Sequence, residues 1–300
     1  MTKTKTLGEI KKISLTDSSY PFLLKNISNP PSVIYFLGEL PAEEIPKIAI
    51  VGTRKATNQG KLLAKRFAYD LSKKGLIVVS GLALGIDACS HEGALAAQAP
   101  TIAVLANGLD DIYPRQHFHL ASKILDFGGA IISEYDVGTP AYPDQFLARN
   151  RIISGLCLGV VIIEAPIHSG ALATARWALE QGREVFIVPG PVDHLNYEGS
   201  HLLLREGGRL VRNADDIIED LSLKEKLKEI KNDKNNQKEI DTSKNESLQK
   251  ILDSLDKKSL TIDEIIKKTN LSSQLVSQNL TFLILKGKVE EKFGKYRKIK

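Results

Sequence analysis

Three short segments combine glycine with hydroxyl or guanidinium side chains, and each follows an apolar run. They are Gly52-Thr53-Arg54, Ser80-Gly81 and Ser169-Gly170. Where such a segment joins a strand to a helix, backbone N–H groups and the positive end of the helix dipole converge on one point, which attracts anions. Arg54 adds a planar, permanently charged donor group that suits phosphate. The three segments therefore predict a site for a phosphate-bearing ligand.

The spacing of the glycines does not match the sequence motifs of two common phosphate sites, those for dinucleotides and for nucleoside triphosphates. Gly52 and Gly60 do not reproduce G-x-G-x-x-G, and the sequence contains no G-x-x-x-x-G-K-[ST]. We therefore expect no nucleotide cofactor. In a doubly wound sheet the three strand ends lie side by side, so their small residues would form a row where an extended phosphodiester approaches the backbone. Thr174 follows in the helix after Ser169-Gly170 and is counted with this row.

A fourth segment, Phe146-Leu147-Ala148-Arg149-Asn150-Arg151, offers an aromatic ring with two guanidinium groups close by. This combination stacks a base and neutralises its phosphates in proteins that bind single-stranded nucleic acid. Phe146, Arg149, Asn150 and Arg151 are thus candidate DNA-binding residues. For Phe146, packing in the core is an equal alternative, and one of the two arginines could instead pair with Glu134 or Glu164.

Composition sets broad limits. The chain has 300 residues, 42% hydrophobic, with a net charge of +5, which fits an anionic partner and many ordinary proteins as well. The apolar stretches are far shorter than the roughly 20 residues of a membrane span, and we expect a cytoplasmic protein without a membrane partner. Cys89 and Cys157 stand far apart and the six histidines are scattered, so neither a metal site nor a catalytic triad is expected.

The middle of the chain predicts the fold. From 47 to 221, short apolar runs alternate with helical patterns, which is typical of a parallel sheet covered by helices. We expect a Rossmann-like, doubly wound, mostly parallel α/β domain, with Gly75 ending its first helix. The predicted strands are 48–51, 77–79, 102–105, 130–133, 160–164 and 185–188. Residues 1–46 contain five prolines, and we expect an irregular N-terminal extension packed on this core.

The C-terminal part has a different composition. Residues 222–245 are rich in Lys, Glu, Asn and Asp and are predicted to form a flexible linker. Residues 246–300 contain three amphipathic helical patterns followed by two short strand patterns around Gly294, which predicts a small winged-helix domain. The segment 286–300 contains seven basic and two acidic residues, a balance that suits contact with DNA phosphates. Contact with another protein is an equal alternative.

The ordered succession of motifs resembles the DNA-processing protein A family, also called Smf, over about 20–220. The segments that carry the resemblance are Val51-Gly52-Thr53-Arg54, Ser80-Gly81-Leu82-Ala83, Gly85-Ile86-Asp87, His91-Glu92-Gly93-Ala94-Leu95, Thr101-Ile102-Ala103-Val104-Leu105, Tyr113-Pro114, Ser133-Glu134-Tyr135, Arg149-Asn150-Arg151-Ile152-Ile153, Ser169-Gly170-Ala171-Leu172-Ala173-Thr174-Ala175, Gly182-Arg183-Glu184-Val185 and Val188-Pro189-Gly190.

The resemblance implies a core that forms a homodimer, binds and protects single-stranded DNA without strong sequence preference, and helps load the RecA recombinase during natural transformation. It also implies that Arg54 and the glycine-rich loops hold phosphates and that Phe146 stacks on a base. The family can place a basic residue shortly before that phenylalanine, where this chain has Pro143-Asp144-Gln145. The basic pocket that the resemblance implies therefore lacks this positive charge.

Two other functions compete with stoichiometric DNA binding. A nucleotide-processing hydrolase of the lysine-decarboxylase-like Rossmann group would need a carboxylate three residues after Thr174, where this sequence has Trp177, so we expect no enzyme. A double-stranded-DNA regulator would use the winged helix as reader and the α/β domain as effector sensor. Loss of DNA affinity on deleting 245–300, with Arg54 dispensable, would favour the regulator.

Overall fold

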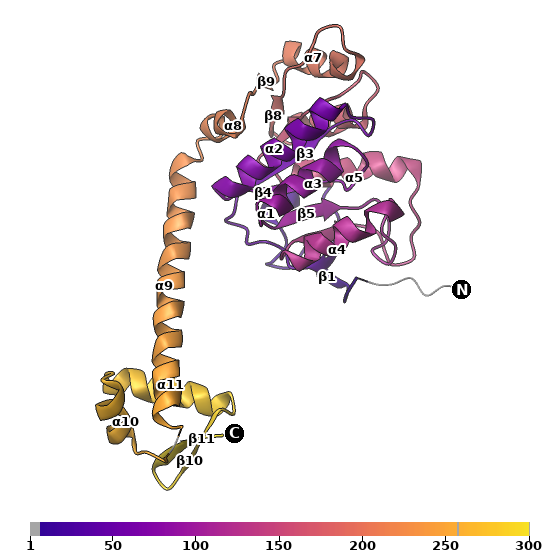
Figure 1. Cartoon of the computed structure of the whole chain (residues 1–300). Coiled ribbons are helices and arrows are strands. Elements are labelled where there is room, and N and C mark those ends of the chain that lie inside the picture. Colours follow the sequence, from indigo (N-terminus) through magenta and orange to yellow (C-terminus); the bar gives the residue numbers. More distant parts are fainter. Residues whose placement is uncertain (1–6, 257, 300) are drawn as a thin grey trace. The chain divides into compact units, whose positions relative to one another are not determined.

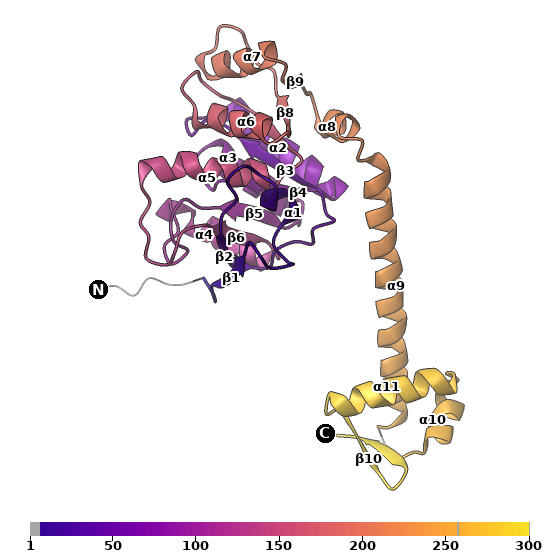
Figure 2. The same ribbon diagram turned by 180° about the vertical axis from the view of Figure 1, so that it is seen from behind.

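The computed structural model describes residues 7–256 and 258–299, and the side chains among these outside 231–245. The chain divides into two compact units, a core unit Met1–Leu227 and a C-terminal unit Lys228–Lys300. Each unit is described by itself below, and both are drawn in Figures 1 and 2. Among the described residues, no helix combines the length and the apolar character needed to cross a membrane.

A nine-stranded sheet forms the centre of the core unit, in the order β1-β2-β6-β5-β4-β3-β7-β8-β9. The strands are β1 (Lys11–Ser14), β2 (Val33–Gly38), β3 (Lys47–Val51), β4 (Ile77–Ser80), β5 (Thr101–Val104), β6 (Ala130–Ser133), β7 (Gly159–Ile162), β8 (Glu184–Ile187) and β9 (Arg209–Leu210). Strands β3 to β9 pair in parallel, whereas β2 pairs antiparallel with β1 and β6. The predicted mostly parallel, doubly wound α/β fold and its six strands are thus confirmed.

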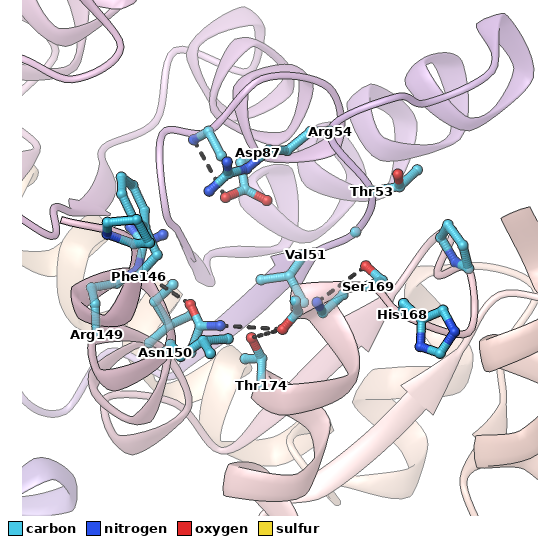
Figure 3. Close-up of a pocket in the computed structure, with 18 of the residues that line it drawn as sticks. Val51, Thr53, Arg54, Asp87, Phe146, Arg149, Asn150, His168, Ser169 and Thr174 are labelled. Atoms are coloured by element: carbon cyan, nitrogen blue, oxygen red, sulfur yellow. Dashed lines mark hydrogen bonds between the residues drawn. The ribbon is translucent and has the colours of Figure 1, made fainter. Parts of the chain in front are cut away.

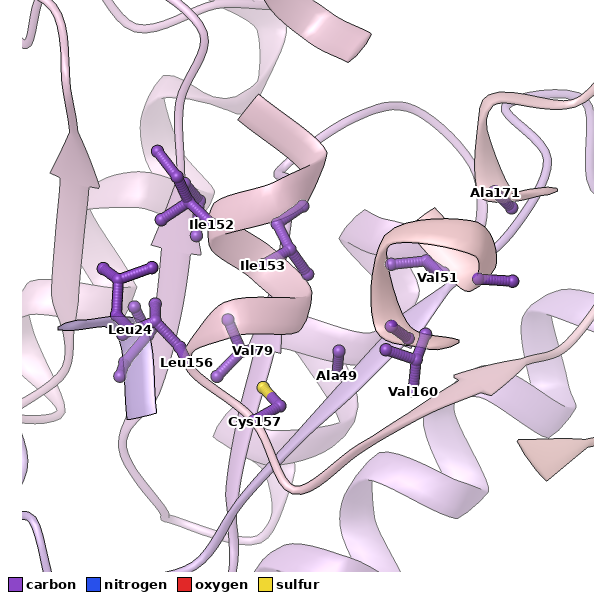
Figure 4. Packing of buried hydrophobic residues seen from close by; sticks show 14 of the residues in the cluster. Leu24, Ala49, Val51, Val79, Ile152, Ile153, Leu156, Cys157, Val160 and Ala171 are labelled. Carbon is purple, nitrogen blue, oxygen red and sulfur yellow. The ribbon is translucent and has the colours of Figure 1, made fainter. Parts of the chain in front are cut away.

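Helices cover both faces of this sheet because alternate strand residues are apolar on both sides. The helices are α1 (Phe22–Lys25), α2 (Asn58–Lys74), α3 (Ile86–Ala96), α4 (Phe118–Asp126), α5 (Pro143–Gly155), α6 (Gly170–Glu180), α7 (Glu198–Arg205) and α8 (Ala214–Asp220), with two short 3₁₀ turns, η1 (Arg115–His117) and η2 (Leu195–Tyr197). One face packs against α1, α5 and α6, and the other against α2, α3, α4 and α8. Figure 4 shows the first of these cores, where Ile152 and Ile153 of α5, and Leu156 directly after this helix, lie over Val79 of β4. Both faces are therefore buried, and the sheet's carboxyl edge is left for the loops.

The N-terminal residues contribute to the sheet, which the prediction of an irregular extension did not include. Strand β2 pairs with β6, and β1 pairs with β2 at the edge. The prolines delimit these elements and leave their interiors intact: Pro21 precedes α1, and Pro31 comes two residues before β2. The β-branched and aromatic run that follows Pro31 is what forms strand β2.

The C-terminal unit begins within α9 (Lys224–Ser254), which runs through the range predicted as a linker. Neither Gly nor Pro interrupts this range, and Lys, Glu and Gln are good helix formers, so a charged composition was a poor guide to local structure here. The unit continues with α10 (Ile262–Thr269), α11 (Ser273–Leu285), β10 (Val289–Lys292) and β11 (Lys295–Lys298).

A small core of its own holds the C-terminal unit together. Its buried members come from the end of α9, from α10, from α11 and from β10: Ile251, Leu255, Ile265, Val276, Leu280, Leu283 and Val289. Thr261 caps α10 and Ser272 caps α11, as Thr/Ser at these positions predict. Three helices followed by a hairpin is the expected order of elements; assignment of this unit to the winged-helix class remains a prediction.

Candidate nucleic-acid interface

A pocket with a volume of about 780 Å³ opens at the carboxyl edge of the sheet, where β3 and β7 lie side by side. The chain passes from β3 through β4 and β5 to β6 on one side, and β7 returns to the other side of β3. The loops after β3 and β7 therefore diverge and leave a crevice, which is the usual ligand position in open α/β sheets. Figure 3 shows residues of the two loops and of α5 around this crevice.

An aromatic ring flanked by two guanidinium groups marks one side of the pocket. The Arg54 guanidinium carbon lies 5.0 Å from the centre of the Phe146 ring and that of Arg149 lies 5.9 Å from it. Tyr113 adds a second ring, tilted by 57° with its centroid 5.4 Å away. Phe146 is half-buried and lines the pocket. The stacking hypothesis requires an accessible ring, whereas a residue packed fully in the core would be buried. Of the two guanidinium groups predicted close to Phe146, that of Arg149 is present, and Arg54 takes the place predicted for Arg151.

The two arginines have different environments. Arg54 is exposed, whereas Arg149 is 4% exposed and donates from Nη1 to the carbonyl oxygens of Gly81 and Val104. Burial lowers the pKa of Arg149 to about 10, and the Asp87 carboxylate opposes that shift. Arg149 thus holds the ends of β4 and β5 together, and the nearby Asp87 carboxylate stabilises its positive charge. The charge of Arg54, in contrast, faces solvent.

The loop after β3 is held by a buried carboxylate from the loop after β7. Glu164 is fully buried, and its carboxylate accepts hydrogen bonds from the Thr57 N–H (3.0 Å), the Thr57 hydroxyl, the Asn196 amide (3.0 Å) and the Tyr197 hydroxyl (3.2 Å). Its carbonyl oxygen also accepts the Thr53 N–H at 2.8 Å. The sequence predicted that the start of α2 would face an external anion, and this is wrong, because the Glu164 carboxylate already occupies that position.

The start of α6 presents the other helix end at the pocket. Ser169 caps this helix by accepting the Ala171 N–H at 3.2 Å, and Gly170 is exposed, with nothing within 4 Å of where a Cβ would stand. Asn150 and Thr174 line the pocket below it, and both donate to the Gly170 carbonyl oxygen, at 3.2 and 3.4 Å. The predicted Ser169, Gly170, Thr174 and Asn150 therefore form one continuous wall.

Ser80 and Gly81 lie behind the pocket and do not line it. The Ser80 side chain is fully buried and donates to the Ile50 carbonyl oxygen at 2.7 Å. A Cβ on Gly81 would come within 2.7 Å of the Arg149 guanidinium and of the Asp87 carboxylate. Both residues are needed for close packing of this strand end, so only two of the three loops predicted to form a phosphate row line the pocket.

Arg151 is also placed away from the pocket. Both Nη atoms contact the Glu134 carboxylate at 2.6 Å, and Nε donates to the Asn29 carbonyl oxygen at 3.0 Å. The alternative that one arginine pairs with Glu134 is therefore the one that the structure bears out. Arg151 ties α5 to the end of β6 and to the N-terminal residues.

Some pocket residues were not singled out from the sequence as site residues. They are Ala83, Asp87, Tyr113, Ala141, Pro143, Leu147, Ile153, Pro166, Ile167, His168, Ala171, Leu195 and Glu198, with Val51 at the floor.

Pro143-Asp144-Gln145, where this chain departs from the family pattern, forms the start of α5. Gln145 accepts the Tyr142 N–H at 2.9 Å, and Asp144 lies in the first turn of α5. These residues favour the start of the helix and add no positive charge.

Comparisons with known proteins place the core of this chain in one family. The family model of DNA recombination-mediator protein A matches residues 11–222. Protein Smf of Escherichia coli is 43% identical over 202 residues, which cover 67% of this chain and 54% of the relative. DNA processing protein DprA of Bacillus subtilis is 40% identical over 213 residues and 71% of each chain. The chain thus spans about half the length of the Escherichia coli relative and more of the Bacillus one.

Two solved structures share the core. The DNA processing protein A of Streptococcus pneumoniae superposes with a TM-score of 0.66 at 37% identity, covering 71% of this chain and 75% of that one. The Helicobacter pylori protein, whose structure describes a single-stranded DNA binding mode, superposes with a TM-score of 0.63 at 29% identity, covering 71% and 95%. By the match of the family model to residues 11–222, and by its similarity in sequence and structure to these relatives, this chain belongs to the DNA recombination-mediator protein A family.

Proposed function

We propose that this protein binds single-stranded DNA in the pocket between the β3 and β7 loops and acts stoichiometrically in DNA recombination during DNA uptake. The observation that carries the proposal is the half-buried Phe146 ring with the exposed Arg54 guanidinium 5.0 Å from its centre, beside the open start of α6. A ring for a base, a cation for its phosphate and an uncovered helix start for the next phosphate are the elements of a single-strand track.

The proposed track runs from Arg54 to Gly170. Phe146 would stack on one base, and Arg54 would contact an adjacent phosphate. The exposed Gly170 allows a second phosphate to approach the first turn of α6, where helix N–H groups and the dipole favour negative charge. Gly52, Thr53, Ser169, Asn150 and Thr174 shape the track, whereas Arg149 holds its wall. We leave out Ser80, Gly81 and Arg151, because their polar groups are used within the core.

The relatives support this proposal. The Helicobacter pylori protein binds single-stranded DNA, and the family is that of a recombination mediator. We further propose that the protein forms a homodimer in the cytoplasm and hands its DNA to the RecA recombinase, as the family resemblance implies. Co-precipitation of RecA by the DNA-loaded protein, compared with the DNA-free protein, tests the hand-over.

We also propose that DNA is bound without turnover. Of the pocket carboxylates, Asp87 accepts the backbone N–H groups of Gly81 and Ala83 at 3.1 and 3.4 Å and lies beside Arg149. A carboxylate engaged in this way holds the loop, and Trp177 stands where the hydrolase motif has its acid. Release of free base from nucleoside monophosphates at rates that fall in Asp87→Asn would favour the hydrolase.

The binding proposal is tested by fluorescence anisotropy of labelled dT oligonucleotides with the full chain. The affinity should fall with salt, with a log–log slope of about −0.7 for each phosphate contacted. Phe146→Ala should weaken binding by about 1–3 kcal/mol. Phe146→Tyr keeps a stacking ring and is the matched control. A flat salt response, or equal affinity of Phe146→Ala and the parent, would rule out the track.

A further inference from the structure

The tip of the hairpin in the C-terminal unit is a second candidate contact for DNA, separate from the core pocket. Strands β10 and β11 are joined by the two residues Phe293 and Gly294 (Figure 1). The Phe293 side chain is fully exposed, at 103%. A large aromatic ring projecting wholly into solvent from a short turn gains nothing from the fold of its own unit.

The backbone at the tip also disfavours a phenylalanine. Phe293 has φ of +53° and Gly294 has φ of +72°, so both central residues are in the left-handed region, as in a type I′ turn. This turn prefers Asn-Gly, whose first residue tolerates positive φ, whereas a bulky side chain there is strained. Asn or Gly in place of Phe293 would therefore make the hairpin more stable.

Two lysines frame the ring. In the β10–β11 register, Lys292 stands directly opposite Lys295, and like charges opposite one another destabilise a strand pair. From 288 to 298 the hairpin has five basic residues and two acidic ones. Glu290 pairs with Arg297 across the strands, and its other carboxylate oxygen lies 3.6 Å from Lys292. Glu291 is opposite Tyr296, on the other face from the two lysines.

We propose that this tip is a DNA contact in which Phe293 stacks on a base and Lys292 and Lys295 neutralise the phosphates on either side. Three locally unfavourable features meet within four residues, and such violations concentrate at functional sites. DNA offsets two of the three, because a base offers the exposed ring a flat apolar partner and its two phosphates offer separate negative charges to the lysines. An apolar protein surface would cover the ring but bring no negative charge to the two facing lysines, of which Lys292 alone has a carboxylate, that of Glu290, nearby in the hairpin.

A tryptophan reporter tests the contact in the full chain. Phe293→Trp is made together with Trp177→Phe, so that the hairpin tip carries the single indole of the chain, and dT oligonucleotide or a blunt duplex is added. Phe22→Trp in the same Trp177→Phe background is the control, because Phe22 is an exposed phenylalanine in the core unit. Anisotropy of the labelled DNA is recorded in parallel.

Quenching of the tip indole as DNA saturates the protein, without quenching of the indole in the Phe22→Trp control, supports the proposal. Quenching by the single strand identifies stacking on an unpaired base, and quenching by the duplex alone identifies a wedge between base pairs. Unchanged emission of the tip indole at saturation overturns the proposal, and so does the absence of any DNA binding. Arg54→Ala acts on the core pocket. If this variant binds DNA as tightly as the parent while the tip indole is still quenched, the core track is contradicted and the tip contact is not.

The variant Phe293→Asn separates binding from folding. It creates Asn-Gly at the turn, so the thermal midpoint should stay the same or rise. In the Arg54→Ala background, the DNA dissociation constant should increase about five-fold or more, which corresponds to the loss of one stacked base. A higher midpoint with unchanged DNA affinity in that background would contradict the inference.

Discussion

The two loops that border the pocket resemble each other in sequence, but the helix that follows each loop starts in a different chemical environment. Each follows a buried parallel strand, β3 or β7, and leads into a helix, α2 or α6. At α2, the Glu164 carboxylate accepts from the N-cap residue Thr57 and is fully buried. At α6, the Ser169 hydroxyl caps the helix, and Gly170 faces open space.

The difference shows that a glycine and a helix after a strand do not by themselves define an anion site. A helix start attracts negative charge, and the protein can supply that charge itself. Glu164 does so for α2 and connects this helix to the loop after β7 and to η2. The β3 loop is thereby fixed, and its contribution to a ligand comes from the Arg54 side chain, whereas the β7 loop offers its backbone.

The largest expected effect comes from removing the internal anion. Glu164→Ala should lower the free energy of unfolding by about 3–5 kcal/mol, because the partners in Thr57, Asn196 and Tyr197 lose a buried acceptor. Guanidinium unfolding followed by circular dichroism measures the loss. Ser169→Ala, which removes the cap of α6, is the matched control and should cost about 1 kcal/mol. Equal losses of unfolding free energy in the two variants would contradict the difference between the two loops.

Arg54→Ala should have the next largest effect, on binding. Removal of an exposed guanidinium that contacts phosphate should weaken DNA binding by about 1.5–3 kcal/mol and make the salt dependence shallower. The unfolding free energy should stay within about 0.5 kcal/mol of the parent. Anisotropy titrations at several salt concentrations test this prediction.

Arg54→Lys keeps the charge and is the control for Arg54→Ala. It should restore the salt dependence and only part of the affinity, because lysine lacks the planar donor pair. An Arg54→Ala variant that binds DNA as the parent does would show that the β3 loop is structural throughout.

A methyl group at Gly52 should destabilise the fold by about 1–3 kcal/mol, through overpacking. The added Cβ would stand 2.6 Å from a side-chain carbon of Ile86 and 2.9 Å from the Glu164 carbonyl oxygen. A shift of the thermal midpoint of the Gly52→Ala protein measures this effect. An unchanged midpoint would mean that the β3 loop is free to move away from Glu164.

Gly170→Ala should have the smallest effect on stability, below about 0.5 kcal/mol, because the added Cβ meets nothing within 4 Å. Its binding effect is the informative one: a phosphate approaching the first turn of α6 would meet the methyl group, and the affinity for single-stranded DNA should fall. Unchanged affinity with unchanged stability would remove the β7 loop from the proposed track.

The regular elements of the core could be predicted because their signals are local. Each of the six predicted strands is a short, largely apolar run, and Gly75, with φ of +103°, ends α2 as expected. Strands β1 and β2 were missed because the prolines around them favour irregular chain. Helix α9 was missed because a solvated, charged segment can be a linker or a helix, and composition does not separate them.

The candidate site was predicted less completely. Phe146, Arg54 and Arg149 were expected together and meet at the pocket. Three similar candidates proved to have internal partners: Ser80 bonds to Ile50, Gly81 packs on Arg149, and Arg151 pairs with Glu134. A buried hydrogen-bond partner can lie dozens of residues away along the chain, so no spacing rule identifies it.

The sequence by itself determined the six central strands of the core with the helices between them, the family, and the residue types at the carboxyl edge of the sheet, because apolar periodicity and short motifs are properties of neighbouring residues. The tertiary structure alone decided which of those residues face solvent. Arg54 and Arg149 both lie beside one ring, yet one is exposed and the other is buried against carbonyl oxygens and Asp87. Their roles differ because desolvation and pairing depend on what the fold brings next to each charge.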